Sequence, residues 1–169
     1  VAPPELPEPL HGFKWAAYTT WLSGMFMLGL IYYASAEVYL IDRSVADLST
    51  PASIGIGLAF LAGGWIVYDL LCRSPLGRRE PILAAVMLVL CAFAAYALTQ
   101  LYSGRGAYIH FGAMLGTIMT ANVFFVIMPG QREMVRARVE GRAPDPMHAA
   151  RGKQRSVHNT YFTLPVLIA

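Results

Sequence analysis

The chain has 169 residues, of which 56% are hydrophobic and only 14% are charged, and its mean hydropathy is +0.49. Soluble domains carry about 25% charged residues, so this composition argues against a soluble globular domain. The net charge of +3 gives no argument for a nucleic-acid partner.

The apolar residues fall in long blocks with the charges between them. An apolar block of about 18 or more residues crosses a ~30 Å hydrocarbon layer as a helix, which satisfies its own backbone polar groups. We therefore predict an all-α fold, a polytopic transmembrane helix bundle with four complete membrane helices and the start of a fifth. In chain order these helices are expected at about residues 13–36, 51–72, 81–102 and 107–128, and then at 158–169.

The N-terminal segment, "VAPPELPEPLHG", has neither a basic region nor an apolar core, so it is not a signal peptide. The chain starts with Val, and its fifth apolar block, "YFTLPVLIA", is too short to span a membrane. We expect residues 1–169 to be a fragment of one integral membrane domain.

Helix-boundary signals accompany the blocks. Ser49-Thr50-Pro51 offers a capping hydroxyl and then a proline at the first turn, and Glu80-Pro81 starts the third helix in the same way. "SGRG" predicts a tight turn before the fourth helix, and "MPGQ" predicts its end. Aromatic residues near block ends fit an interfacial belt: Trp15, Trp21, Tyr32, Tyr33, Trp65, Tyr68 and Tyr102.

The basic residues indicate the orientation. Eleven of the 13 Lys and Arg residues lie at the first helix start, in the 73–80 loop and in the 129–157 loop, which share one side. Only Arg43 and Arg105 lie on the other side. Because basic loops stay in the cytoplasm, loops 73–80 and 129–157 are predicted to be cytoplasmic.

The two cysteines, Cys72 and Cys91, form no C-x-x-C pair, haem attachment motif or zinc spacing. We interpret them as small buried residues. No metal site is predicted with certainty.

Polar residues within membrane blocks need a partner or a role. Asp69 and Arg73 are four residues apart, which favours a structural ion pair at the interface, with a charge pair lining a cytoplasmic cavity as the alternative. Asn122 lies about 120° around the helix from His110, so the two belong to different faces. Packing against neighbouring helices explains Asn122, and Gly112 and Gly116 form a G-x-x-x-G pattern for close helix approach.

His110 leaves two readings open. It is either a packed, hydrogen-bonded histidine or a functional one, since histidine is an axial haem ligand and a proton carrier. On the cytoplasmic side, Gln131 and Arg132 follow the fourth helix, and Arg155, His158 and Asn159 begin the fifth. These residues either meet the lipid headgroups or form a donor-rich mouth for a planar anion.

Four long strings carry a family resemblance: "VAPPELPEPLHGFKWAAYTTWLSG", "VYDLLCRSPLGRRE", "HFGAMLGTIMTANVFFVIMPGQRE" and "RGKQRSVHNTYFTLPVL". Together they resemble the N-terminal membrane domain of the bacterial cytochrome-c-linked urate oxidases. The resemblance implies an oxidoreductase of purine catabolism in the bacterial inner membrane, which oxidises urate to 5-hydroxyisourate and passes electrons to a cytochrome c domain.

This chain departs from that family in three ways. It lacks the family's first, histidine-bearing membrane helix, the helices after "NTYFTLPVL" and a C-x-x-C-H motif for haem c. We therefore expect the fragment alone to be inactive, with the c-type haem on a domain outside it or on a soluble cytochrome c.

Chemistry suggests the roles of individual residues in that reaction. Arg155 and His158 are the candidate catalytic residues, and the candidate urate ligands are Gln131, Asn159, Asn122 and Arg132. His110 is the candidate ligand of a b-type haem. The alternatives are a haem-binding electron-transfer membrane anchor, and a transporter or structural membrane module.

Overall fold

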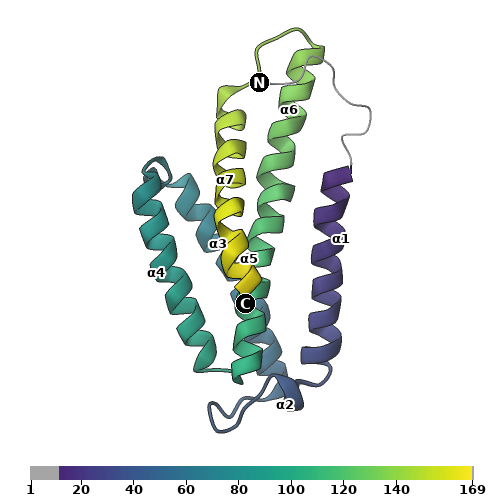
Figure 1. Ribbon diagram of the computed structural model, residues 1–169, viewed down its shortest axis with the longest axis vertical. Coiled ribbons are helices and arrows are strands. Elements are labelled where there is room, and N and C mark those ends of the chain that lie inside the picture. The colour runs from purple at the N-terminus through teal and green to yellow at the C-terminus, as the bar shows by residue number, and fades with distance from the viewer. Residues whose placement is uncertain (1–11, 169) are drawn as a thin grey trace.

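The computed structural model describes residues 12–168, which are helical almost throughout and contain no strand. Figure 1 shows long helices running roughly side by side, with a short helix at one end. In chain order the elements are α1 (Gly12–Met27), a π-helical segment (Leu28–Tyr33), α2 (Ala36–Tyr39), α3 (Thr50–Arg73), a 3-10 turn (Pro75–Arg78), α4 (Glu80–Thr99), α5 (Gly104–Asn122), a second π-helical segment (Val123–Ile127), α6 (Met128–Val139) and α7 (Pro146–Ile168).

Three helices in the described range are long and apolar enough to cross a membrane. They are α3, α4 and the continuous helix Gly104–Val139 formed by α5, the second π-helical segment and α6. On α4, Leu88, Val89 and Phe93 are each about two-thirds exposed or more. Such a continuous apolar surface is rare on a soluble monomer and normal on a helix that faces lipid.

The first predicted membrane helix is not among these three, because α1 has 16 residues before it runs into the six-residue π-helical segment. The starts of α3 and α4 fall within one residue of the prediction. Ser49 does precede α3, but its side chain makes no capping hydrogen bond.

The predicted turn "SGRG" belongs mostly to α5. Ser103 is the N-cap, and its hydroxyl accepts a hydrogen bond from the Gly106 amide over 3.1 Å. The helix therefore starts at Gly104, three residues earlier than expected, and α4 ends three residues earlier, at Thr99.

The prediction that "MPGQ" ends the fourth helix is wrong. Pro129 and Gly130 lie inside a helix that continues to Val139. Proline in a regular helix removes one hydrogen bond and collides with the carbonyl of residue i−4. Here a π-helical segment ends just before it, and its i→i+5 bonds change the hydrogen-bond ladder, so the chain passes the proline without a break.

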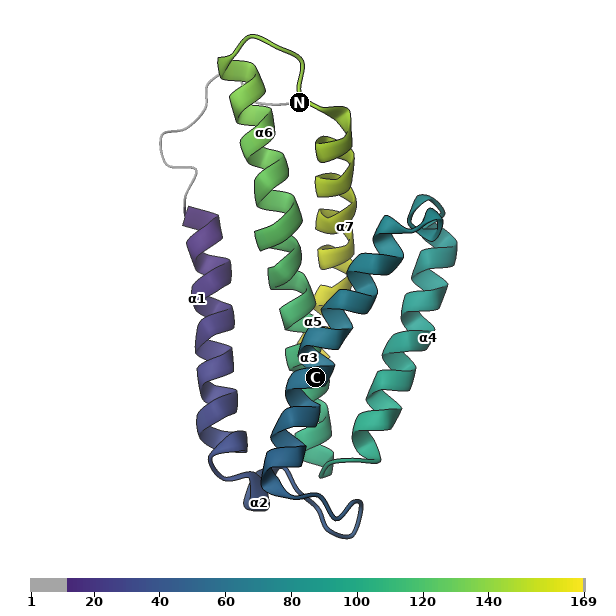
Figure 2. The ribbon, with the colours of Figure 1, turned by 180° about the vertical axis from the view of Figure 1, so that it is seen from behind.

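The predicted loop 129–157 is instead mostly a helical hairpin of α6 and α7. α7 begins at Pro146, twelve residues before the predicted start, and the Met147 amide donates to the Asp145 carboxylate over 2.8 Å. Gly130 allows the close approach, since a Cβ there would lie 3.0 Å from the His148 carbonyl oxygen. Figures 1 and 2 show this hairpin extending beyond the turn that joins α3 to α4.

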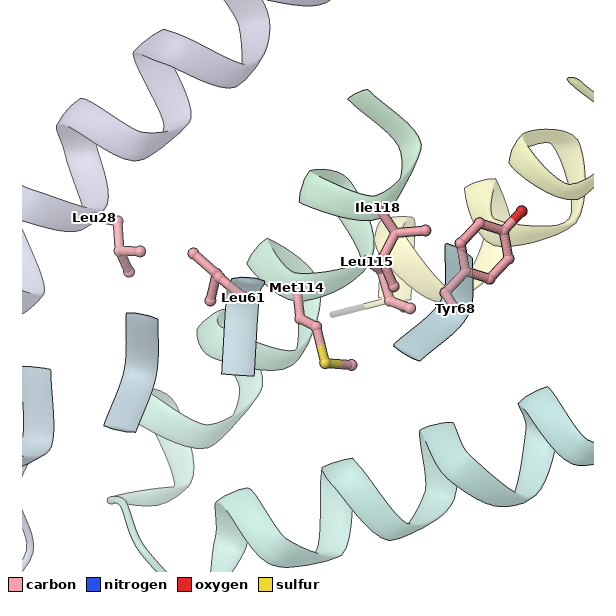
Figure 3. Packing of buried hydrophobic residues seen from close by; sticks show 6 residues of the cluster. All are labelled: Leu28, Leu61, Tyr68, Met114, Leu115 and Ile118. Atoms are coloured by element: carbon pink, nitrogen blue, oxygen red, sulfur yellow. The ribbon is translucent and has the colours of Figure 1, made fainter. Parts of the chain in front are cut away.

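The bundle core forms where α3 packs against α5. Gly57 and Gly64 of α3 face α5, where added Cβ atoms would come within 2.6 Å of His110 and Met114 side-chain atoms. Of the predicted G-x-x-x-G pair, Gly116 takes no part in this contact, since a Cβ there would meet nothing within 4 Å among the described residues. Figure 3 shows the core side chains, with Leu115 and Ile118 between Leu61 and Tyr68.

Candidate functional site

A buried ion-pair cluster links α3 to α7. The Arg155 guanidinium is 3% exposed and donates from Nη2 to Asp69 Oδ1 over 2.8 Å. Arg73, on the bundle surface, donates from Nε to the other carboxylate oxygen of Asp69 over 2.6 Å. The predicted Asp69–Arg73 ion pair is therefore present, but it is part of a larger group. Two guanidinium groups share one carboxylate, so this trio carries a net positive charge.

A chain of hydrogen bonds continues from Arg155 into the bundle. Arg155 Nη1 donates to Asn122 Oδ1 over 3.4 Å, and Asn122 Nδ2 donates to the Tyr68 hydroxyl over 3.1 Å and to Asn159 Oδ1 over 3.0 Å. The Tyr68 hydroxyl lies 2.8 Å from His158 Nδ1. The Arg155 guanidinium also sits 4.7 Å from the centroid of the Tyr68 ring, a cation–π contact.

Local sequence explains how the cluster assembles. Arg155, His158 and Asn159 are spaced i, i+3, i+4 and so share one face of α7. Tyr68 and Asp69 are consecutive on the last turns of α3, and Asn122 ends α5 where the π-helical segment begins. Irregular helical turns of this kind often occur at functional sites. We refer to Asp69, Arg73, Arg155, Asn122, Asn159, Tyr68 and His158 as the charged cluster.

Of the cavities that border the charged cluster, two have charged side chains in their lining. A cavity of about 90 Å³ is lined by the charged end of the cluster together with polar residues of the α6–α7 hairpin, including Asp69, Arg73, His148, Arg151, Gln154 and Arg155. A cavity of about 710 Å³, here named the α4–α7 cavity, lies between α4, α5 and α7. Its lining is mostly apolar, and its polar side chains are Tyr68, Glu80, His158 and Tyr161.

His110 belongs to a separate cluster near the opposite ends of α3 and α5. Its Nδ1 lies 2.8 Å from the Gly106 carbonyl oxygen, which only accepts, so Nδ1 carries the proton. Nε2 is then the acceptor for the Tyr33 hydroxyl at 3.1 Å. Tyr102 stacks on the ring and donates its own hydroxyl to the Ser53 carbonyl oxygen over 2.6 Å. This His110 cluster is neutral, and the ring is fully buried.

The described residues around His110 do not fit a haem. An axial ligand needs a ring nitrogen that iron can approach. Nδ1 is held by a carbonyl and Nε2 by Tyr33, and a single Cβ added at Gly57 would lie only 2.6 Å from Nε2. Among residues 12–168 there is also no group of three or more His, Cys, Asp or Glu side chains able to hold a metal ion.

The structure brings together four of the predicted site residues: Arg155, His158, Asn159 and Asn122. Gln131 and Arg132 lie exposed on α6, without a hydrogen bond to the charged cluster. As predicted, His110 and Asn122 take part in different groups.

Sequence reasoning missed Tyr68, which the aromatic-belt interpretation assigned to the membrane interface. The side chain is in fact fully buried between α3, α5 and α7. The available signal was its place next to Asp69 in the sequence and one turn before Cys72.

The comparisons identify the family. The family model described as urate oxidase N-terminal matches residues 1–169, the whole chain. The chain belongs to this urate oxidase N-terminal family. Comparison with curated proteins and with solved structures gave no match. In this member of the urate oxidase N-terminal family, a buried Arg155–Asp69 ion pair, the exposed Arg73, two amide groups and an imidazole gather where the last turns of α3 meet the middle of the Gly104–Val139 helix and α7.

Proposed function

We propose that the chain is the membrane domain of a urate-oxidising oxidoreductase, in which the charged cluster binds the urate anion. Three lines support this: the family, the three membrane-length helices, and the net positive charge that Arg73 and Arg155 leave on a single carboxylate. The positive charge carries the proposal. Arg155 is buried and shares the Asp69 carboxylate with Arg73, so one carboxylate faces two arginines, and such an arrangement suits an anionic ligand.

The reaction converts urate and water to 5-hydroxyisourate, two protons and two electrons. In this proposal Arg155 neutralises the anion, and the amides of Asn122 and Asn159, which bond to Arg155, to Tyr68 and to each other, hold the cluster in place. Two molecules of a c-type cytochrome, or one such domain acting twice, take the electrons one at a time. The chain's own residues bind, orient and handle protons, and the described residues give no support for a haem ligated by His110.

The proposal includes a location in the bacterial inner membrane. The α3–α4 turn and the α6–α7 hairpin, which hold most of the basic residues, face the cytoplasm. Urate then approaches the charged cluster from the cytoplasmic end and occupies the α4–α7 cavity, which Tyr68 and His158 line, while Arg73, Arg151 and Arg155 line the smaller cavity beside it.

The test is urate-dependent reduction of cytochrome c by the native protein purified from its membrane in detergent. We expect Arg155→Gln to lower kcat/KM for urate by about 10- to 100-fold, the loss of one charge-assisted hydrogen bond. Arg138→Gln is the matched control, because Arg138 is exposed on α6 away from the cluster. Equal activity of the two variants contradicts the proposal, and so does urate uptake into vesicles without oxidation, which instead identifies a transporter.

A further inference from the structure

Arg155 determines which atoms donate and which accept in the hydrogen bonds of the charged cluster. Arginine has only donors, so Asn122 must turn its Oδ1 toward Arg155 and its Nδ2 toward Tyr68. The same Nδ2 donates to Asn159 Oδ1, while Asn159 Nδ2 donates to the Met119 carbonyl oxygen over 3.0 Å. Both amides are thereby fixed in orientation without ambiguity.

The order continues to the imidazole. The Tyr68 oxygen accepts from Asn122, so its own hydrogen is available for His158 Nδ1, 2.8 Å away. The second neighbour of Nδ1 is the Cys72 sulfur at 3.9 Å, and a thiol also donates to such a nitrogen. The arrangement in which every one of these groups donates its hydrogen has Nδ1 of neutral His158 as the acceptor and the ring proton on Nε2.

The other ring nitrogen of His158, Nε2, has no hydrogen-bond partner within the described part of the chain. His158 also lines the α4–α7 cavity. That cavity, at about 710 Å³, is in the size range of small-molecule sites, which typically combine an apolar lining with a few directed polar groups.

We propose that His158 presents its Nε2–H to the α4–α7 cavity as a hydrogen-bond donor, and that Tyr68 is the positioning residue that holds this tautomer. The identity of the acceptor, a carbonyl oxygen of urate, rests on the proposed function; the tautomer does not. In the resting state His158 is then a donor to the ligand rather than a base at Nε2, which changes the role expected from the sequence.

The tautomer is measured by ¹⁵N NMR of the native protein labelled on histidine, in detergent and without urate, at a pH where His158 is neutral. Protonated and unprotonated imidazole nitrogens give well-separated signals, and His158→Gln assigns the pair. We expect a protonated Nε2 and an unprotonated Nδ1. A proton on Nδ1 overturns the proposal, whatever the activity of the protein.

Tyr68→Phe tests the positioning role. We expect a mixture of the two tautomers at His158 and a roughly tenfold lower kcat/KM for urate, the effect of one neutral hydrogen bond. Tyr102→Phe is the matched control, because it removes another buried tyrosine hydroxyl that contacts Ser53 and not His158. An unchanged tautomer in Tyr68→Phe overturns the positioning role. Should that variant fail to fold, the wild-type tautomer still decides the donor assignment.

The two proposals fail in different ways. A wild-type Nε2–H tautomer in a protein that does not oxidise urate leaves the positioning by Tyr68 intact and removes the proposed substrate. Urate oxidation by a protein whose His158 proton is on Nδ1 leaves the proposed function intact and removes the donor role of His158. Addition of urate to the wild type is expected to shift the Nε2 signal, and an unshifted signal places urate outside the α4–α7 cavity.

Discussion

The bundle buries polar side chains in two places, and the two differ in kind. The His110 cluster is neutral, lies between elements of the N-terminal half and α5, and leaves both ring nitrogens of His110 occupied. The charged cluster joins α3, α5 and α7, holds three ions and borders both the smaller cavity and the α4–α7 cavity. Burial of a histidine in a membrane helix is therefore not enough to identify a site. The charged cluster differs from the His110 cluster in two ways. It has two arginines for one carboxylate, and its side chains line cavities.

The largest effect is expected from breaking the ion pairs of the charged cluster. Asp69→Ala leaves the Arg155 guanidinium buried without a counter-charge, which typically costs about 3–5 kcal/mol of folding free energy. Arg73→Ala, at an exposed side chain, is expected to cost about 1 kcal/mol or less. Denaturant unfolding in detergent measures both. Adding Arg155→Met to Asp69→Ala should restore most of the loss, and no restoration would show that Arg155 is not the buried partner.

A smaller loss is expected from crowding the His110 cluster. Gly57→Ala places a Cβ 2.6 Å from His110 Nε2 and 3.0 Å from the Tyr33 oxygen, and overpacking of this kind costs about 1–3 kcal/mol. Gly63→Ala, six residues along the same helix, adds a Cβ that meets no described residue within 4 Å and should be neutral or slightly stabilising. Equal thermal stability of the two variants would mean that His110 is loosely packed, contrary to the closed cluster described above.

A still smaller effect tests whether the two clusters are independent. Tyr33→Phe removes the hydroxyl that donates to His110 Nε2, at a cost of about 1 kcal/mol. The kcat/KM for urate is expected to stay within about twofold of the wild type, because within residues 12–168 no hydrogen bond or ring contact joins Tyr33 to the charged cluster. A loss comparable with that of Arg155→Gln would link the clusters and end the distinction between them.

The smallest expected effect is the change in local stability when the exposed ion pairs at the end of α6 are titrated. These pairs serve as a reference for the stability contributed by the buried ion pairs of the charged cluster. Hydrogen bonds from Arg136 and Arg142 hold the pKa of Glu140 below its ordinary value of 4.5. A lowered pKa in the folded state adds stability above pH 4.5 that is lost as the pH falls through the lower folded value. The protection of the backbone amides at the end of α6, measured relative to their intrinsic exchange rate at each pH, should therefore fall slightly at acid pH, and Glu140→Gln should abolish that change.

The sequence was sufficient to predict the membrane-length helices, because bilayer thickness fixes their length and apolar blocks mark them. It misplaced the two features nearest the site. Pro129 was read as a stop because the π-helical segment before it has no sequence signature as strong as the proline itself. The start of α7 was missed because residues 146–157 are polar, although Asp145-Pro146 offers the same kind of start signal as Glu80-Pro81.

The candidate site was predictable by residue type and only partly by partner. Arg155, His158 and Asn159 are near neighbours in sequence, and their helical spacing alone puts them on one face. Asp69 has Arg73 as an obvious partner at i+4, whereas its contact with Arg155, 86 positions away, depends on how α3 and α7 cross. Tyr68 was the least predictable, since a tyrosine near a helix end fits the membrane interface as well as the core.

The most direct test of the account compares one residue from each cluster in the same assay. Urate-dependent cytochrome c reduction is measured for Arg155→Gln and for His110→Gln in the native protein, with folded protein quantified in each preparation. We expect at least a tenfold loss of kcat/KM in Arg155→Gln and less than a threefold change in His110→Gln. The opposite order, with His110 essential and Arg155 dispensable, would contradict the assignment of the site to the charged cluster.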